Sequence, residues 1–349
     1  MRILISGNVS ADSFARNISA GFESMGHSVV TLDEAPIHHD NHDGFRPNLW
    51  RGLSRLYPGI ERWWHRRLIE QASRFQPDLV LITHGVLEPE VARRIRTATN
   101  CKLAAWYPDS QACLGRQYLL ASDLDAWFFK DPYMVETFRA KLGINAHYLS
   151  EACNPLWHRR VALTQPERAK YGCDLCTAGN MYYYRARILE MFKDYDLKIW
   201  GQNYPRWLIS PLRSRYPGVF VAELEKAKAF NAAKIVLNTM HPGEIAGVNC
   251  RLFEAAGCGA FQIADWKPAL PELFEPEREI VTFRTRQELK EKVDYYLDRP
   301  EERQAIAERA YCRAHREHTY EIRLNKILKV LGLDGPSVYA GKLLASQAT

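Results

Sequence analysis

Short apolar runs alternate with amphipathic segments along most of the chain. An apolar run over residues 2–8 ends at a glycine turn, and Phe14, Ile18 and Phe22 then recur at helical spacing. A second apolar run follows over residues 27–33. A strand, a helix and another strand in this order predict a parallel sheet.

The same alternation continues in two series, separated by residues 153–172, where prolines and charges interrupt any period. In the first series we expect further strands at residues 77–85, 102–109, 125–131 and 144–152. In the second series we expect strands at residues 173–179, 196–201, 235–240, 260–265 and 278–283. Helices are expected between the strands, and residues 286–331 show a long helical pattern.

This organisation predicts an α/β protein with two Rossmann-like, doubly wound domains that face a cleft. We expect an N-terminal domain over residues 1–155, a C-terminal domain over residues 170–330 and a tail over residues 331–349. Sheets of this kind bind ligands outside the carboxyl ends of their strands, so the site is expected in the cleft.

The composition and the lengths of the apolar runs favour a soluble globular protein. The hydrophobic fraction is 46% and the charged fraction 25%, as in soluble globular proteins, and no apolar run is long enough to cross a membrane. The beginning of the sequence does not resemble a signal peptide, so we expect a cytoplasmic location. The net charge is +6, which suits an anionic ligand or a membrane surface but establishes neither.

The cysteine and histidine patterns do not predict a metal site. The eight cysteines are scattered, which argues against a disulfide scaffold. Cys173 and Cys176 form a C-x-x-C without a second pair, and residues three apart in a strand are expected on opposite faces. Residues 37–43, IHHDNHD, are more typical of a polar loop than of a metal centre. We therefore expect no metal.

The stretch GVNCRLFEAAGCGAF at residues 247–261 brings an arginine and a glutamate to the start of a predicted helix. The free N–H groups of a helix start favour an anion, and Arg251 adds a cationic fork that fits phosphate oxygens. Glu254 lies one turn further on, where a carboxylate can accept hydrogen bonds from a ribose or sugar diol. The alternative is an ordinary Arg–Glu pair within the helix, and spacing leaves both open.

The longer stretch LNTMHPGEIAGVNCRLFEAAGCGAFQIAD resembles the C-terminal signature of GT-B glycosyltransferases. It is most similar to the branch that includes CgeB-like proteins, where R-x-F-E-A precedes a G-x-G-A or G-x-G-P stretch. The resemblance covers about residues 170–330 and the N-terminal half only in outline. It implies that the C-terminal domain binds a nucleotide-diphosphate sugar without a metal, with Glu254 on the ribose and Arg251 on the diphosphate or sugar.

One position departs from the family pattern. Many retaining relatives carry two glutamates eight positions apart, and the residue eight before Glu254 is Ala246. Glu244 lies close by and is the candidate replacement. The stereochemical course of the reaction therefore stays open.

Other residues at strand ends are expected to contact the donor. Gly179, Asn180 and Arg185 resemble the family element beside the donor phosphates, and their alternative is a loop with a surface arginine. Gly201 and Asn249 are expected to line the cleft.

The loop after the first strand is expected to approach the donor from the opposite domain, through residues that resemble the family's glycine-containing loop: Gly7, Asn8 and Ser10. The loop does not match G-x-G-x-x-G, so we do not expect NAD.

Two residues at strand ends of the N-terminal domain are candidates for catalysis. His84 and Asp109 are the best bases for an acceptor hydroxyl if the reaction inverts, although a lone histidine is more often structural. Asp131 precedes a proline at a predicted helix start, which is typical of a cap.

Residues 49–75 are basic and aromatic. They are candidates for contact with an anionic membrane or a lipid-linked acceptor, through Trp50, Arg55, Trp63, Trp64, Arg66 and Arg67. The alternative is a helix whose aromatic rings pack on the sheet while its arginines face water.

The sequence thus predicts a hexosyltransferase that acts on a glycan, lipid-linked or protein acceptor hydroxyl, with no nucleic acid partner. It is expected in the cytoplasm or peripherally on the inner membrane face. The alternatives are a nucleotide-sugar epimerase of the same architecture and a non-catalytic nucleotide-sugar-binding protein.

Overall fold

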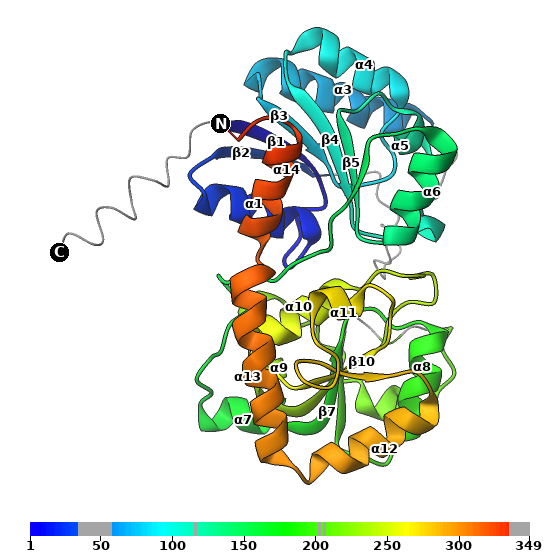
Figure 1. The fold of residues 1–349 in the computed structure, drawn as a ribbon, viewed down its shortest axis with the longest axis vertical. Helices are drawn as coiled ribbons and strands as arrows, with labels where there is room; N and C mark the ends of the chain where they lie inside the picture. Colours follow the sequence, from blue (N-terminus) through cyan, green and yellow to red (C-terminus); the bar gives the residue numbers. More distant parts are fainter. Residues whose placement is uncertain (34–57, 115–116, 202–203, 205–206, 335–349) are drawn as a thin grey trace, which may run out of the picture.

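Two parallel sheets, one in each half of the chain, form the framework of the protein (Figure 1). They are seen in a computed structural model that describes residues 1–33, 58–114, 117–201, 204 and 207–334. The sheets belong to an N-terminal and a C-terminal lobe, which confirms the expected two doubly wound α/β units.

The first sheet has six strands in the order β2-β1-β3-β4-β5-β6, and all its pairs are parallel. Its strands are β1 (Arg2–Gly7), β2 (Ser28–Asp33), β3 (Leu79–Ile82), β4 (Lys102–Tyr107), β5 (Ala126–Phe129) and β6 (Ala146–Tyr148). The helices of this half are α1 (Phe14–Ser24), α3 (Pro58–Phe75), α4 (Pro89–Ala98), α5 (Tyr118–Ala121) and α6 (Pro132–Leu142), with a 3-10 turn η1 (Gln111–Cys113).

The second sheet has five parallel strands in the order β11-β10-β9-β7-β8. Its strands are β7 (Cys173–Ala178), β8 (Leu197–Trp200), β9 (Ala233–Asn238), β10 (Gln262–Asp265) and β11 (Val281–Phe283). The helices of this half are α7 (Gln165–Tyr171), α8 (Tyr183–Leu189), α9 (Glu223–Ala232), α10 (Cys250–Gly257), α11 (Leu270–Leu273), α12 (Arg286–Leu297), α13 (Pro300–Glu317) and α14 (Tyr320–Val330). Two further 3-10 turns are η2 (Glu190–Phe192) and η3 (Pro211–Arg215).

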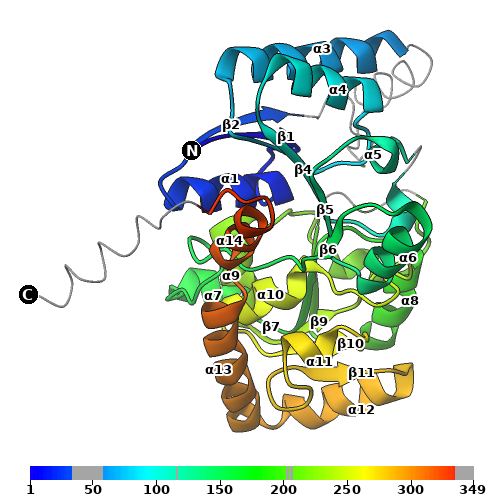
Figure 2. The same ribbon diagram turned by 45° about the horizontal axis from the view of Figure 1, so that its top comes forward.

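Both faces of the first sheet are covered, which explains why its strands are continuous apolar runs. Leu4, Val80 and Leu103 pack in a core with Trp64 of α3, whereas alternate residues such as Ile3 and Leu79 pack in a separate core. Figure 2 shows the corresponding layers: α3 and α4 lie on one side of the sheet, and α1 and α14 lie on the other.

The last helix crosses back to the N-terminal lobe. Tyr320, Leu324 and Ile327 of α14 are buried in the same core as Ile18 and Phe22 of α1, and both views place α14 beside α1. The expected domain boundary at residue 330 is therefore wrong for this helix. Local periodicity predicted the helix but carried no information about which sheet it covers.

The chain crosses between the lobes at two adjacent segments. Cys153 N–H donates to the His318 carbonyl (2.9 Å), and Tyr320 N–H donates to the Cys153 carbonyl (3.1 Å). The first segment falls in the region where the sequence predicted an interdomain crossing. These hydrogen bonds pair the outgoing and returning crossings.

A bulge in β7 overturns one expectation from strand geometry. Asp174 N–H and Leu175 N–H both donate to the Asp196 carbonyl, each at 3.0 Å. Such a bulge shifts the alternation of side chains by one residue. Cys173 and Cys176 therefore lie in one core cluster rather than on opposite faces.

We predict that α14 stabilises the N-terminal lobe by burying its apolar face. Leu324→Ala removes a fully buried side chain that packs beside Gly21 of α1, so unfolding should become easier by about 2–5 kcal/mol. Ile322→Ala, on the exposed face of the same helix, is the control and should cost about 0.5 kcal/mol or less. Chemical denaturation measures both, and equal losses would contradict the assignment of α14.

Candidate functional site

Arg185 is fixed at the point where the strand order of the second sheet reverses, between β7 and β9. Its Nε donates to Thr239 Oγ1 (3.0 Å), its Nη2 donates to the Thr239 carbonyl (3.1 Å), and its Nη1 donates to the Asn180 carbonyl (2.6 Å). Thr239 directly follows β9, and Asn180 follows β7. Ligands of doubly wound sheets bind at this position.

Arg251 reaches the same position from the start of α10. Asn249 caps this helix: its Oδ1 accepts the Leu252 N–H (3.2 Å), and its Nδ2 donates to Asn238 Oδ1 (2.8 Å). Asn249 thus positions the start of the helix.

Gly179 allows the two arginines to come together. It has a φ of +107°, and a Cβ at this position would collide with Arg251 Nη2 and lie 3.5 Å from Arg185 Nη1. Gly201 lies behind it at the end of β8, where a Cβ would lie 2.9 Å from the Gly179 carbonyl oxygen. The sequence-predicted residues Gly179, Arg185, Gly201 and Arg251 are therefore brought to one place.

The two guanidinium groups leave an unbalanced positive charge. Burial, and then the neighbouring charge of Arg251, lower the pKa of Arg185 to about 10. Arg185 is 4% exposed and Arg251 8%, and within the described residues neither forms an ion pair with a carboxylate. Arg251 Nε is buried without a hydrogen-bond partner in that part of the chain. Buried charges are normally paired, so this arrangement favours an anionic ligand.

Glu254 lies one turn further along α10, where a lysine meets it. Lys226 of α9 forms an ion pair with Glu254 (Nζ to Oε2, 2.8 Å) and a second with Asp12 of the N-terminal lobe. Burial opposes the charge of Lys226, but Glu254 and Asp12 outweigh it and raise the lysine pKa above its ordinary value. The internal Arg251–Glu254 pair that spacing allowed is not among the ion pairs of the described residues.

His158 completes this group from the crossing segment. Its Nδ1 accepts the Asn154 N–H (2.9 Å), which leaves Nε2 to face Asp12 Oδ1 (3.7 Å) and Glu254 Oε1 (4.0 Å). Burial would raise the pKa of Asp12, but Lys226 and His158 lower it to about 2.

Asp12, His158 and Glu254 also have the spacing of a three-residue cation site. The Lys226 ammonium makes ion pairs with both carboxylates, so the protein supplies its own cation there. The histidine-rich stretch at residues 37–43 lies outside the described residues.

A second lysine group joins the two lobes. We call the contact between the lobes, where these lysine groups lie, the seam. Lys130, which follows β5, forms an ion pair with Glu244 of the C-terminal lobe (Nζ to Oε1, 2.7 Å) and lies 3.7 Å from Glu151 Oε2. Burial would lower the pKa of Lys130, but Glu151 and Glu244 raise it above its ordinary value. Burial raises the pKa of Glu151 to about 8 despite the opposing charge of Lys130.

Asp131 does more than the predicted capping. Its Oδ1 accepts the Tyr133 N–H at the start of α6 (2.9 Å), and its Oδ2 accepts Ile245 N–H (3.0 Å) and Ala246 N–H (3.1 Å). The last two bonds hold the loop between β9 and α10, so this cap also joins the lobes.

The candidate bases have different environments. His84 is 2% exposed; its Nδ1 accepts the Val86 N–H (3.3 Å), its Nε2 bonds to Ser6 Oγ (2.8 Å), and its ring packs on Trp64. This environment favours the structural interpretation of His84. Asp109 is exposed just after the end of β4, near Lys130 and Glu244.

The loop after β1 reaches the seam through Asp12 rather than through the residues singled out in the sequence. A Cβ at Gly7 would collide with Thr83 Oγ1, so this glycine permits close packing. Asn8 Oδ1 accepts the Ser10 N–H (2.8 Å), which folds the loop on itself. No described contact brings Gly7, Asn8 or Ser10 to the arginine pair.

Sequence reasoning missed Asp12, Lys130, Glu151, His158 and Lys226. Each is a common residue in an unremarkable local context, and a short pattern gives no sign that it is buried against the other lobe. The one available signal was position, because Asp12 and Lys130 follow strands that end at the expected cleft.

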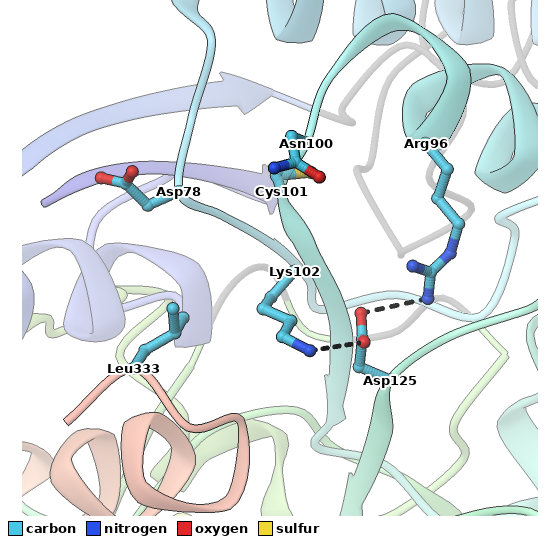
Figure 3. A pocket seen from close by; sticks show the side chains of 7 residues that line it. All are labelled: Asp78, Arg96, Asn100, Cys101, Lys102, Asp125 and Leu333. Carbon is cyan, nitrogen blue, oxygen red and sulfur yellow. Dashed lines mark hydrogen bonds and ion pairs between the residues drawn. The ribbon is translucent and has the colours of Figure 1, made fainter.

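An open cavity of about 350 Å³ lies at the amino ends of strands β3, β4 and β5 in the first sheet (Figure 3). It is lined by Asp78, Arg96, Asn100, Cys101, Lys102, Asp125 and Leu333. Arg96 and Lys102 both form ion pairs with Asp125, at 3.0 and 3.2 Å. The cavity lies at the amino ends of the strands, away from the seam, and its charges are already balanced.

Comparison with known proteins agrees with the resemblance noted in the sequence. Residues 185–329 match a family model described as glycosyl transferase-like. A 125-residue segment is 28% identical to the spore protein CgeB of Bacillus subtilis (strain 168) and covers 33% of this chain. That segment spans only 38% of the CgeB length.

Solved structures resemble the chain over nearly its whole length. Sucrose-phosphate synthase from Thermosynechococcus elongatus gives a TM-score of 0.67 at 12% identity, covering 99% of this chain and 100% of that one. Anabaena Alr3699/HepE in complex with UDP and glucose gives 0.66 at 13% identity, covering 95% and 99%. An E. coli trehalose-6-phosphate structure bound with UDP-2-fluoro glucose gives 0.64 at 12% identity, covering 95% and 99%. The expected GT-B fold is confirmed.

We predict that Glu151 makes stability depend on pH. Its pKa is raised in the folded protein, so its stabilising contribution is present below about pH 4.5 and is lost as the pH rises through about 8. From pH 5 to 9, the wild type should therefore lose on the order of 4 kcal/mol relative to Glu151→Gln. Urea unfolding at several pH values measures this difference. Glu136→Gln, at an exposed position of α6, is the control. Parallel stability profiles for wild type and Glu151→Gln would contradict the prediction.

Proposed function

We propose that this protein is a glycosyltransferase that moves a hexose from a nucleotide-diphosphate sugar to an acceptor hydroxyl. The observation that carries the proposal is the buried pair Arg185 and Arg251, which has no carboxylate partner within the described residues. A diphosphate is an anion whose oxygens fit two guanidinium forks. The family match over residues 185–329 includes both arginines.

The arginine pair and the start of α10 are proposed to neutralise the leaving diphosphate without a metal ion. Fixed cations in a site closed to water stabilise developing negative charge strongly. Arg185 is held by three hydrogen bonds, so little reorganisation is needed when the diphosphate departs.

Glu254 is proposed to accept hydrogen bonds from the ribose hydroxyls of the donor. Its place one turn beyond Arg251 supports this role, and Lys226 holds one of its oxygens at 2.8 Å. Lys226 also pairs with Asp12, so ribose recognition and the contact between the lobes share one ammonium.

The acceptor hydroxyl is proposed to lose its proton to Asp109 if the reaction inverts. Asp109 is exposed at the carboxyl end of β4, whereas His84 is buried and bonded. A general base must reach the proton that it removes, so we favour Asp109. A Michaelis complex enclosed by the two lobes would limit hydrolysis of the donor.

The acceptor is proposed to be a glycan, a lipid-linked sugar or a protein, with a cytoplasmic enzyme peripheral to the inner membrane face. Helix α3 presents Arg66, Arg67 and the half-exposed Trp63 outward, and the Arg67 guanidinium lies 4.9 Å from the Trp63 ring centre. Trp64 is fully buried and donates to the Asp33 carbonyl (2.9 Å), so it belongs to the core. Trp50 and Arg55 lie outside the described residues. No described helix has the length and apolarity needed to span a membrane.

We predict that one nucleotide class stabilises the protein through Arg251. A thermal-shift panel of UDP, GDP, ADP, CMP and dTDP with their common sugars should give a clear rise in Tm for one class. UDP and UDP-glucose are the first to test, because similar structures contain them. Arg251→Ala should weaken binding about 10- to 100-fold, since charged hydrogen bonds to phosphate are lost.

Arg187→Ala is the matched control, because Arg187 lies on the exposed side of α8 and pairs with Glu190. It should leave the affinity unchanged. Absence of a shift with every nucleotide, or equal binding by Arg251→Ala, would argue against the proposed donor site.

We also predict that Gly179 is required for nucleotide binding beyond its effect on stability. Gly179→Ala strains a left-handed backbone and pushes Arg251 away, so the affinity should fall at least about tenfold. Gly26→Ala is matched for strain, with a φ of +81°, but nothing lies within 4 Å of its Cβ. Titration calorimetry should show a loss for Gly179→Ala alone. Similar affinities for the two variants would indicate that strain, not displacement of Arg251, matters.

A further inference from the structure

Lys130 has a carboxylate partner in each lobe. This buried lysine follows β5 of the N-terminal lobe, and its Nζ lies 2.7 Å from Glu244 Oε1 of the other lobe and 3.7 Å from Glu151 Oε2. Glu151 is fixed to the N-terminal lobe, because Leu149 and Ala152 on either side of it are buried in a core of the first sheet. If the lobes parted, Glu244 would leave Lys130 and Glu151 would stay with it.

Lys226 has the same arrangement on the opposite side of the seam. It is buried on α9, next to Ala227 in a core of the second sheet. Lys226 forms one ion pair with Asp12 of the N-terminal lobe and another with Glu254 of its own lobe (Nζ to Oε2, 2.8 Å). Each buried lysine thus has one carboxylate that joins the lobes and one that would remain if they separated.

The second carboxylate of each lysine matters most when the first is withdrawn. A buried charge that loses its partner is strongly destabilising, so a lysine with a cross-lobe carboxylate alone would oppose any separation of the lobes. A carboxylate in the lysine's own lobe removes much of that cost. Ion pairs that only fixed the lobes together would not need it.

We propose that Lys130 and Lys226 form a reversible latch between the lobes. The lobes part when each lysine gives up its cross-lobe carboxylate, Glu244 or Asp12, and keeps the one in its own lobe. This inference does not depend on the proposed function, because the latch is built from contacts between the lobes and needs no ligand.

Opening of the latch releases the loop between β9 and α10. Asp131 of the N-terminal lobe accepts the N–H groups of Ile245 and Ala246, and these hydrogen bonds break when the lobes part. The loop begins at Thr239, which binds Arg185, and ends at Asn249, the cap of the helix that carries Arg251. The latch therefore controls a segment that adjoins the arginine pair at both of its ends.

Glu151 offers the sharpest test, because its charge matters more in the parted lobes than in the joined ones. Burial raises its pKa to about 8 despite the charge of Lys130, so at pH 7 it is largely protonated while Glu244 holds the lysine. Replacing it by glutamine costs the joined lobes little, but the parted lobes lose the nearest carboxylate to Lys130 in its own lobe. The other titratable groups around Glu151 are Asp109, Glu244, Cys250, Glu254 and Tyr320.

Hydrogen exchange of the Ile245 and Ala246 amides, followed by NMR at pH 7 without ligand, measures the opening of the seam. Glu244→Gln and Asp12→Asn each remove a cross-lobe partner and should raise the exchange rates at least about tenfold. Glu151→Gln should lower them about threefold or more, whereas a merely destabilising change would raise them. Glu136→Gln, at an exposed position of α6, is the control and should leave the rates unchanged.

Amides of β1 and β9 report unfolding of the two sheets and separate opening of the seam from a change in overall stability. Faster or unchanged exchange in Glu151→Gln would overturn the latch, because Glu151 would then only support the joined lobes. Unchanged exchange in Glu244→Gln or in Asp12→Asn would overturn it as well, since that ion pair would not hold the lobes together. Equal changes at the loop and sheet amides would mean an effect on overall stability and would also contradict the proposal.

Discussion

Pairing of buried charges across the seam is the interaction on which the arrangement of the two lobes depends. Lys130 of the N-terminal lobe pairs with Glu244 of the C-terminal lobe, and Lys226 of the C-terminal lobe pairs with Asp12 of the N-terminal lobe. Removing such ions from water is expensive, so each lysine is tolerated only where a carboxylate meets it closely. The pairs therefore specify how the lobes meet more than they add to stability. The position of the loop between β9 and α10 follows from that specification.

The two arginines Arg185 and Arg251 follow the opposite pattern. Arg185 and Arg251 lie side by side, and among the described residues no carboxylate neutralises them. The lysine pairs are complete without a ligand, whereas the arginine pair is not. This contrast separates the residues that join the two lobes from those that would hold an anion. Glu244 differs from the other carboxylates of these pairs only in detail: Lys130 meets one of its oxygens, and the other accepts no hydrogen bond from a described residue.

The solved structures share the fold at 12–13% identity, which is too low for side-chain roles to be carried over from them. A GT-B fold can support different chemistries, and a function has to be argued from the site itself. Here the site provides an unpaired cationic fork, a carboxylate one helical turn from it and an exposed aspartate of the N-terminal lobe. This combination suits transfer from a diphosphate leaving group. The resemblance to CgeB covers only part of that protein and does not identify the acceptor.

The sequence by itself determined most of the local structure and part of the site. Its apolar periodicity predicted both parallel sheets, because strands covered on both faces must be continuous apolar runs. The sequence also placed Arg185 and Arg251 on helices that follow strands of the second sheet. This order indicated that the two arginines lie close together, because the carboxyl ends of neighbouring parallel strands meet at one edge of a sheet. Asp131 was correctly expected to cap a helix, a role decided by residues next to it.

Only the tertiary structure decided which distant residues meet. Helix α14 covers the N-terminal sheet, a bulge brings Cys173 and Cys176 together, and His84 is enclosed by Ser6, Val86 and Trp64. The lysine pairs and the second role of Asp131 likewise depend on contacts between lobes. A charged residue has the same appearance in a sequence whether it faces water or a buried partner, because its partner is set by packing and not by its neighbours in the chain.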